Sequence, residues 1–168
     1  EGAAFVGLVF PDRTDVFISY AHDDEVLSGG FVRYLALAIK RRFEAEMRRR
    51  NSTSIGRAAD VFLDKTGLPP AGDLGSELSG IVENSVFLTI VVGCSYPNSI
   101  WCGKELECFA KRFGDNRSLV LRHTFVAVLE ERALVGYWGQ HLETPVRPIY
   151  ESFFDDASGE TIPFRLEN

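Results

Sequence analysis

The sequence has 168 residues, a length that suits one domain with one hydrophobic core. Apolar residues make up 45% of the chain and charged residues 25%, as in soluble globular proteins. The formal net charge of -6 argues against direct nucleic-acid binding, and no apolar stretch is long enough to predict a membrane span.

Residues 1–14 are interpreted as an N-terminal extension or linker. Their apolar run has no preceding basic residues, so it does not resemble a signal peptide. The sequence does not begin with Met, and we therefore expect it to come from a longer protein whose fused or partner domain carries a sensing function. One domain is expected over residues 15–168, with its C-terminal end truncated.

The three cysteines, Cys94, Cys102 and Cys108, follow no CxxC or Cys/His spacing that suits zinc. Their odd number favours reduced thiols in a cytoplasmic protein. We expect no metal site, and we interpret the cysteines as small buried apolar residues.

The first half of the chain predicts two strands separated by a helix. DVFISY (15–20) is a nearly continuous apolar run, typical of a strand buried on both faces. A polar turn is expected over 21–30. Apolar residues then recur every four positions from Phe31 to Met47 and predict a helix. DVFLD (60–64) predicts the second strand.

The next segment predicts a loop, a helix and the central strand. KTGLPPAGD (65–73) contains two Gly and two Pro and predicts an irregular loop. Asp73 is expected to cap a helix with Leu78 and Ile81 on its apolar face. SVFLTIVVG (85–93) gives the strongest strand signal and is placed at the centre of the sheet.

A turn over 94–99 leads into another helix, for which Asn98 or Ser99 is the expected cap. The positions expected to bury this helix are Leu106, Phe109, Ala110 and Phe113. DNRS breaks the helix, TFVAVLE (124–130) predicts a fourth strand, and IYESFF (149–154) predicts an edge strand.

Alternating strands and helices predict an α/β fold. We expect a flavodoxin-like three-layer arrangement, with a central parallel sheet of about five strands in the order 2-1-3-4-5 and helices on both faces. Ligands bind such sheets at the carboxyl ends of the strands, where the strand order reverses. The turns YAHDD (20–24) and CSYPNS (94–99) are therefore expected to form a crevice.

Several familiar site motifs do not occur in the sequence. It contains no Gly-rich dinucleotide fingerprint, no P-loop and no G-x-S-x-G elbow, which argues against the enzymes that use them. No Asp follows the third strand, which argues against a phosphorylation receiver. His22 is the only histidine near the expected crevice, and a turn residue is the better interpretation of it than a general base.

Trp101 and Glu105 are one helical turn apart, so they share a face of the helix that begins beside the crevice. A tryptophan offers a flat apolar wall to a ring, and a carboxylate can stabilise positive charge that develops in a reaction. On spacing alone, the better interpretation is a core tryptophan and a solvated glutamate.

Three stretches together change this interpretation. DVFISYAHDDE (15–25), ADVFLDKTGLPPAGDLGSEL (59–78) and SVFLTIVVGCSYPNSIWCGKELECF (85–109) resemble the first box, the BB loop and the W-C-x-x-E-L helix of the Toll/interleukin receptor (TIR) family. The resemblance covers residues 15–130 in one consistent order. The family's last box, around an F-W pair, has no clean counterpart here.

The resemblance implies either of two functions. Some TIR domains are non-catalytic adaptors that act by TIR–TIR assembly, and others cleave NAD⁺ at the nicotinamide–ribose bond. The second kind has a glutamate at the position of Glu105, which implies that Glu105 is catalytic and that NAD⁺ is a substrate and no cofactor is needed. A nucleoside-transferring enzyme with a glutamate nucleophile is a third alternative.

The remaining site residues follow from their places beside the crevice and in the BB loop. The expected substrate-binding residues are Tyr20, Ala21, Asp64, Lys65, Ser95, Trp101 and Cys102. The expected assembly loop contains Gly67, Leu68, Pro69 and Pro70. The resemblance also implies a cytoplasmic defence protein that is activated by self-assembly and yields ADP-ribose or a cyclic isomer. The basic stretch 40–50 is interpreted as a solvated face or an assembly surface.

Overall fold

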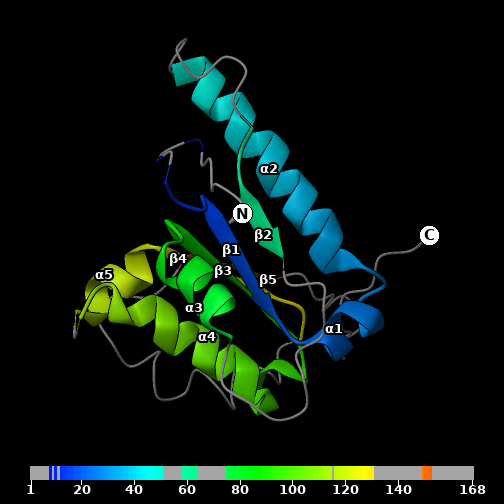
Figure 1. Ribbon diagram of the computed structural model, residues 1–168. Coiled ribbons are helices and arrows are strands. Elements are labelled where there is room, and N and C mark those ends of the chain that lie inside the picture. The colour runs from blue at the N-terminus through cyan, green and yellow to red at the C-terminus, as the bar shows by residue number, and fades with distance from the viewer. Residues whose placement is uncertain are drawn as a thin grey trace.

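The computed structural model describes Leu8, Phe10 and residues 12–50, 58–63, 75–114, 116–130 and 149–152, the last four by their backbone alone. Its strands are β1 (Val16–Tyr20), β2 (Val61–Leu63), β3 (Phe87–Val92), β4 (Thr124–Val128) and β5 (Ile149–Ser152) (Figure 1). Its helices are α1 (His22–Leu27), α2 (Phe31–Arg50), α3 (Ser76–Glu83), α4 (Ile100–Lys111) and α5 (Arg117–Arg122), with a 3₁₀ turn, η2, at Tyr96–Asn98.

The five strands form one parallel sheet in the order β2-β1-β3-β4-β5, which confirms the predicted fold class and strand order. Tyr20 at the end of β1 is in register with Val91 of β3. Because β2 lies on one side of β1 and β3 on the other, the order reverses between β1 and β3. This point of reversal is where the sequence predicts a crevice.

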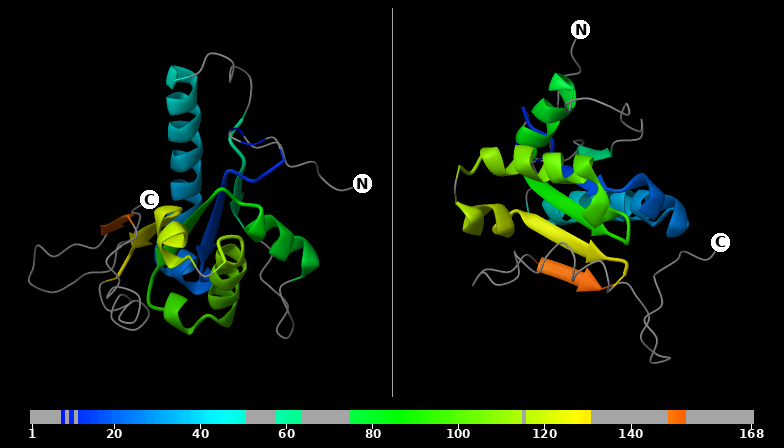
Figure 2. Two further views of the ribbon diagram at one scale, coloured as in Figure 1. Left: turned by 90° about the vertical axis from the view of Figure 1, so that its left-hand side faces the viewer. Right: turned by 90° about the horizontal axis from the view of Figure 1, so that it is seen from below.

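Alternation along each strand divides the core into two layers. Phe17, Leu88 and Val126 pack with α3 and α4 on one face of the sheet. Val16 and Ile18 pack with α2 on the other face. Figure 1 shows α2 on one side of the sheet and α3, α4 and α5 on the other, so the three-layer prediction is confirmed. Figure 2 shows α2 extending well past the sheet.

The strand with the strongest apolar signal lies at the centre, as predicted. β3 pairs with β1 on one side and β4 on the other, and its residues from Leu88 to Val92 are buried. The strand itself is shorter than the predicted 85–93. Val86 and Phe87 donate backbone hydrogen bonds to Thr14 and Asp15, which anchor the start of β3 beside β1.

One helix replaces a predicted turn, and a second helix was not predicted. The prediction of a turn over 21–30 is wrong for α1, whose first turn carries Asp23, Asp24 and Glu25, acids that favour a helix N-terminus. α5 follows the predicted break after α4, and the Asn116 side chain caps it by accepting a hydrogen bond from the Leu119 N–H at 3.2 Å. These short helices have little periodic signal because each spans fewer than two turns.

The predicted helix caps and the predicted burial of the cysteines are partly right and partly wrong. Ser99 is the cap of α4, as one of the two alternatives had it. Gly75 is the N-cap of α3, and the predicted cap Asp73 lies outside the described residues. Cys102 and Cys108 are buried, but the interpretation is wrong for Cys94, which is exposed where the chain leaves β3.

Candidate active site

A pocket of about 620 Å³ lies where the strand order reverses, at the carboxyl ends of β1 and β3. Its volume falls in the range of small-molecule and cofactor sites. Its lining residues are Tyr20, Ala21, His22, Asp23, Cys94, Ser95, Asn98, Ser99, Trp101 and Glu105. Five of the six predicted site residues that the structure describes therefore line one cavity together with His22, and Glu105 is one of them.

The start of α4 places its functional face in this pocket. The Ser99 hydroxyl accepts a hydrogen bond from the Cys102 N–H at 3.3 Å and ends the preceding extended segment. The helix therefore begins at Ile100, and Trp101 and Glu105 fall one turn apart on the wall of the cavity.

Glu105 is 5% exposed, so the expectation from spacing alone of a solvated glutamate is wrong. Its Oε2 accepts a hydrogen bond from the Ser19 Oγ at 2.5 Å. The Ser19 Oγ also lies 2.9 Å from the Tyr96 hydroxyl, and both of these side chains are buried. The carboxylate is thus anchored by Ser19 of β1, which is itself paired with Tyr96 of η2.

Trp101 both packs in the core and lines the pocket. It is half-buried against the cluster that α4 forms with the sheet. The Lys104 ammonium lies 4.8 Å from the centre of its ring, a cation–π distance. The core packing considered for this tryptophan is therefore observed, and its role as a wall for a ring stays a prediction that its place in the lining allows.

Tyr20 and His22 form a second aromatic element of the lining. Their rings are stacked, with centroids 5.1 Å apart and planes at 7°. His22 is exposed on α1. The stack puts two flat surfaces on the β1 side of the cavity, and Trp101 contributes one from α4.

Cys102 lies behind this lining. It is 1% exposed, and burial raises the pKa of its thiol to about 12, with a further contribution from the charge of Glu105. The thiol is therefore protonated at neutral pH and is unsuited to nucleophilic attack. The structure places it beside Glu105 and not among the residues that face the pocket.

Asp24 holds the two turns of the pocket together. It is 2% exposed, and its carboxylate accepts hydrogen bonds from the Ser95 N–H at 2.9 Å and the Tyr96 N–H at 3.0 Å. Gly93 makes room for it, because a Cβ at that position would lie 2.5 Å from the Asp24 Cγ. The first and third strand-to-helix connections are thereby joined across the point of strand reversal.

Sequence reasoning missed Ser19, Tyr96 and Asp24. A hydroxyl inside the apolar run DVFISY was the available signal for Ser19, since a buried hydroxyl requires a partner. The acidic pair after β1 was the signal for Asp24. Neither signal identifies the partner, which lies more than 70 residues away along the chain in each case.

Six predicted residues lie outside the described residues: Asp64, Lys65, Gly67, Leu68, Pro69 and Pro70. Their roles stay predictions. Within the described ranges, no group of three or more His, Cys, Asp or Glu is placed to hold a metal ion. None of the helices described there combines the length and apolar character that crossing a membrane requires.

No family model matches the chain, and no curated protein matches it significantly. Among solved structures, the chain is similar to the TIR domains in the structure of the activated Roq1 resistosome directly recognizing the pathogen effector XopQ. The similarity has a TM-score of 0.43 at 21% sequence identity and covers 69% of this chain and 57% of that chain. The matched part is thus less than two thirds of the Roq1 chain.

Proposed function

We propose that this chain is a TIR-type NAD⁺ glycohydrolase in which Glu105 is the catalytic residue. The observation that carries the proposal is the placement of Glu105, buried, in the wall of the pocket and one helical turn from Trp101. The sequence resemblance over residues 15–130 implies the reaction. The lining of the pocket supports the proposal because it contains a buried carboxylate and aromatic side chains.

The leaving group explains why one carboxylate is enough. Ordinary glycosidases use two, one of them an acid that protonates the leaving oxygen. In NAD⁺ the bond from the ribose to the pyridinium nitrogen breaks with both electrons going to that nitrogen, so nicotinamide leaves as a neutral molecule. Water then adds to the ribose carbon and loses a proton, which gives ADP-ribose, nicotinamide and H⁺.

The ribose becomes oxocarbenium-like as this bond breaks, and a nearby negative charge stabilises it. The burial of Glu105 strengthens that interaction, because water screens it less than it would at an exposed site. A preorganised group of this kind contributes on the order of 10²–10³ in kcat. Trp101 and the Tyr20–His22 stack supply flat surfaces for the aromatic rings of the dinucleotide.

The test is nicotinamide release from NAD⁺ by wild type and by Glu105→Gln, which keeps the size of the side chain and removes its charge. We expect kcat to fall at least 100-fold. Glu107→Gln is the matched control, since Glu107 is exposed on the same helix and is not in the lining. Equal rates for wild type and Glu105→Gln would overturn the assignment.

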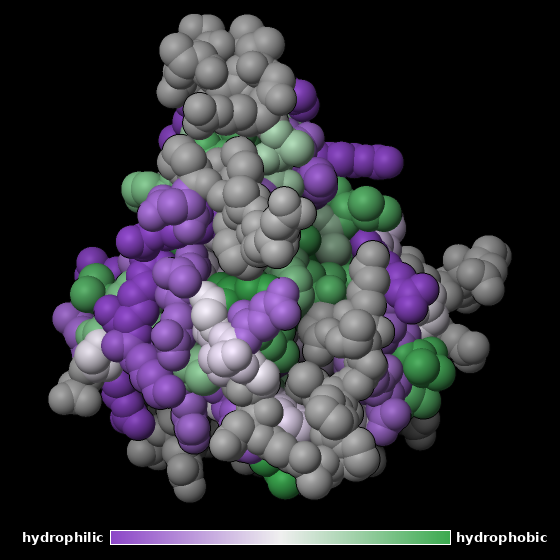
Figure 3. Space-filling view, in the orientation of Figure 1, coloured by the Kyte–Doolittle hydropathy of each residue, from purple (hydrophilic) through white to green (hydrophobic). Residues whose placement is uncertain are grey.

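Assembly is the second proposed property, and a surface feature favours it. α1 and α2 expose four large apolar side chains: Val26, Leu27, Tyr34 and Leu37. Figure 3 shows hydrophobic atoms at the edge beside α1, away from the hydrophilic cover of α3 and α4. We propose that copies of this domain associate in the cytoplasm during defence signalling. Absence of NAD⁺ turnover even at high protein concentration would favour the non-catalytic adaptor instead.

A further inference from the structure

The carboxylate of Glu105 accepts a hydrogen bond from the buried Ser19 hydroxyl, which in turn lies beside the buried Tyr96 hydroxyl, and sequence reasoning assigned neither residue to the site. We propose that Ser19 and Tyr96 are positioning residues, forming a hydroxyl chain that fixes the orientation of Glu105 and keeps its carboxylate ionised at the working pH. The inference rests on the proposed function for its effect on rate, but its effect on the ionisation of Glu105 can be measured without turnover.

The number of protons available fixes the direction of donation along the hydroxyl chain. Ser19 has one hydroxyl proton, which it donates to the Glu105 Oε2 at 2.5 Å. When Glu105 is ionised, the Ser19 oxygen can therefore only accept from Tyr96, whose hydroxyl lies 2.9 Å away. The order of donation is Tyr96 to Ser19 to Glu105, and it ends on the negative charge.

The geometry is that of a charge-assisted interaction. A distance of 2.5 Å lies in the range of an O–H donor to an ionised oxygen acceptor. Ser19 is 1% exposed and Tyr96 is 0% exposed, so neither hydroxyl can exchange its partner for bulk water without opening the core. Burial alone favours the protonated form of a carboxyl group, whereas hydrogen bonds to the charged form favour ionisation.

The anchors come from two elements other than α4. Ser19 lies on β1 and Tyr96 on η2, and η2 is itself fastened by the Asp24 bond to the Tyr96 N–H. A side chain that is hydrogen-bonded to a residue of another element has fewer accessible rotamers than one that is attached only to its own helix. The reacting carboxylate is therefore placed before substrate arrives, which is the condition for electrostatic stabilisation without reorganisation.

Among the described residues, other ionisable groups around the pocket come from several elements. α1 contributes His22, Asp23 and Asp24, β1 contributes Tyr20, the turn after β3 contributes Cys94, η2 contributes Tyr96, and α4 contributes Cys102 and Lys104. On α3, Glu83 pairs with Lys111 at 3.8 Å, at the far end of α4. Cys102 stays neutral below its pKa of about 12, so it adds no charge in the range tested.

The experiment compares Ser19→Ala and Tyr96→Phe with wild type over the acid limb of the pH dependence of kcat/KM. Removal of the direct donor should move this limb to higher pH by about 1–2 units and lower kcat at neutral pH by about 10- to 100-fold. Tyr96→Phe acts through Ser19, so the same changes should be smaller. KM should change less than kcat, because the pocket walls are kept.

A second readout observes the carboxylate directly. Glutamate labelled with ¹³C at the side-chain carboxyl gives a resonance for Glu105 that Glu105→Gln identifies by its loss. Its pH midpoint should rise in Ser19→Ala and, less, in Tyr96→Phe. This titration needs no turnover, so a chain that does not cleave NAD⁺ would lose the proposed function while the inference about Ser19 is still decided.

Ser85→Ala is the matched control. Ser85 is also a fully buried serine, and its hydroxyl donates to the Ile81 carbonyl at 2.7 Å, a bond that ends on α3 and not on Glu105. It should alter stability without moving the midpoint. The inference is overturned if Ser19→Ala and Tyr96→Phe titrate like wild type, or if Ser85→Ala moves the midpoint as far. Should Ser19→Ala not fold, Tyr96→Phe decides by the same criteria.

Discussion

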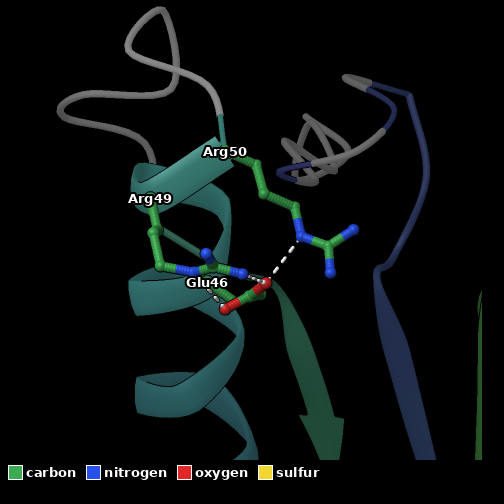
Figure 4. A network of polar contacts seen from close by, with 3 residues as sticks. All are labelled: Glu46, Arg49 and Arg50. Atoms are coloured by element: carbon green, nitrogen blue, oxygen red, sulfur yellow. Dashed lines mark hydrogen bonds and ion pairs between the residues drawn. The ribbon is translucent and has the colours of Figure 1, made fainter.

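Two glutamates at opposite ends of this molecule accept short hydrogen bonds in opposite surroundings. Glu46, near the outer end of α2, accepts from Arg49 Nη2 at 2.6 Å and from Arg50 Nε at 2.6 Å (Figure 4). Glu105 accepts from a neutral serine at 2.5 Å and is buried in the pocket wall. Glu46 thus has charged partners at an exposed position, whereas Glu105 accepts from a neutral hydroxyl in the candidate active site.

The comparison teaches that ionic partners alone do not mark a functional carboxylate. The hydrogen bonds from Arg49 and Arg50 lower the pKa of Glu46 to about 2, so that group stays charged at every ordinary pH. Its interactions are screened by water and salt, and the two arginines are largely exposed. At Glu105 the Ser19 hydroxyl matters more than either arginine does at Glu46, because burial removes the competing solvent.

The largest expected effect on stability comes from Asp24, a buried acid beside the pocket. Asp24→Ala leaves the Ser95 and Tyr96 N–H groups without their acceptor, and we expect the free energy of unfolding to fall by about 2–4 kcal/mol. Urea unfolding at pH 7 measures it. Asp23→Ala is the control, since Asp23 is exposed, and it should leave the midpoint nearly unchanged. Equal losses for the two would break the contrast between buried and exposed acids.

An effect of intermediate size for each pH unit is expected from Cys102, which reports on the surroundings of Glu105. Burial raises the pKa of its thiol in the folded protein from the ordinary 9.0 to about 12. The unfolded chain therefore loses this proton first as the pH rises. The free energy of unfolding should be unaffected by this group below pH 9 and should fall by up to about 1.4 kcal/mol per pH unit between pH 9 and 12.

Urea unfolding at several alkaline pH values checks this slope. Cys102→Ala should lose the part of the slope that belongs to this thiol, whereas Cys94→Ala, which removes an exposed thiol, should keep it. If the wild-type slope survives in Cys102→Ala, the slope does not come from this thiol. The surroundings of Glu105 would then be more hydrated than the contrast with Glu46 assumes.

The smallest effect is expected from Glu46. Glu46→Gln removes both arginine interactions, yet the melting temperature at neutral pH and 0.5 M salt should stay within experimental scatter of wild type. Any contribution exists above about pH 4.5 and is lost as the pH falls toward the lowered pKa of about 2. A loss as large as that of Asp24→Ala would contradict the comparison. Thermal unfolding followed by circular dichroism measures it.

The sequence was sufficient for the features that repeat or run continuously. The apolar runs of β1 and β3 predict buried parallel strands, and the strand order then locates the pocket between the turns at Tyr20 and Ser95. The spacing of Trp101 and Glu105 predicts their shared face. Each of these inferences uses residues that are close together in the chain or a rule of topology.

Pairings between distant residues could not be predicted. Ser19 meets Glu105 across 86 positions, and Asp24 meets the Ser95 N–H across 71. Any of the buried hydroxyls and acids could have had another partner, and only the packed sheet brings these together. The burial of Glu105 itself depends on them, since a carboxylate in the core requires donors. The short helices α1 and α5 escaped prediction because their stability depends on the same packing.

The close fit of Gly93 against Asp24 has a consequence for how this sequence can change over generations. A side chain at position 93 would collide with the Asp24 carboxyl group. Shortening Asp24 first would leave the N–H groups of Ser95 and Tyr96 without this acceptor. Either single step passes through a less stable intermediate. The two positions, 69 residues apart, are therefore expected to be inherited as one unit, and neither can drift alone.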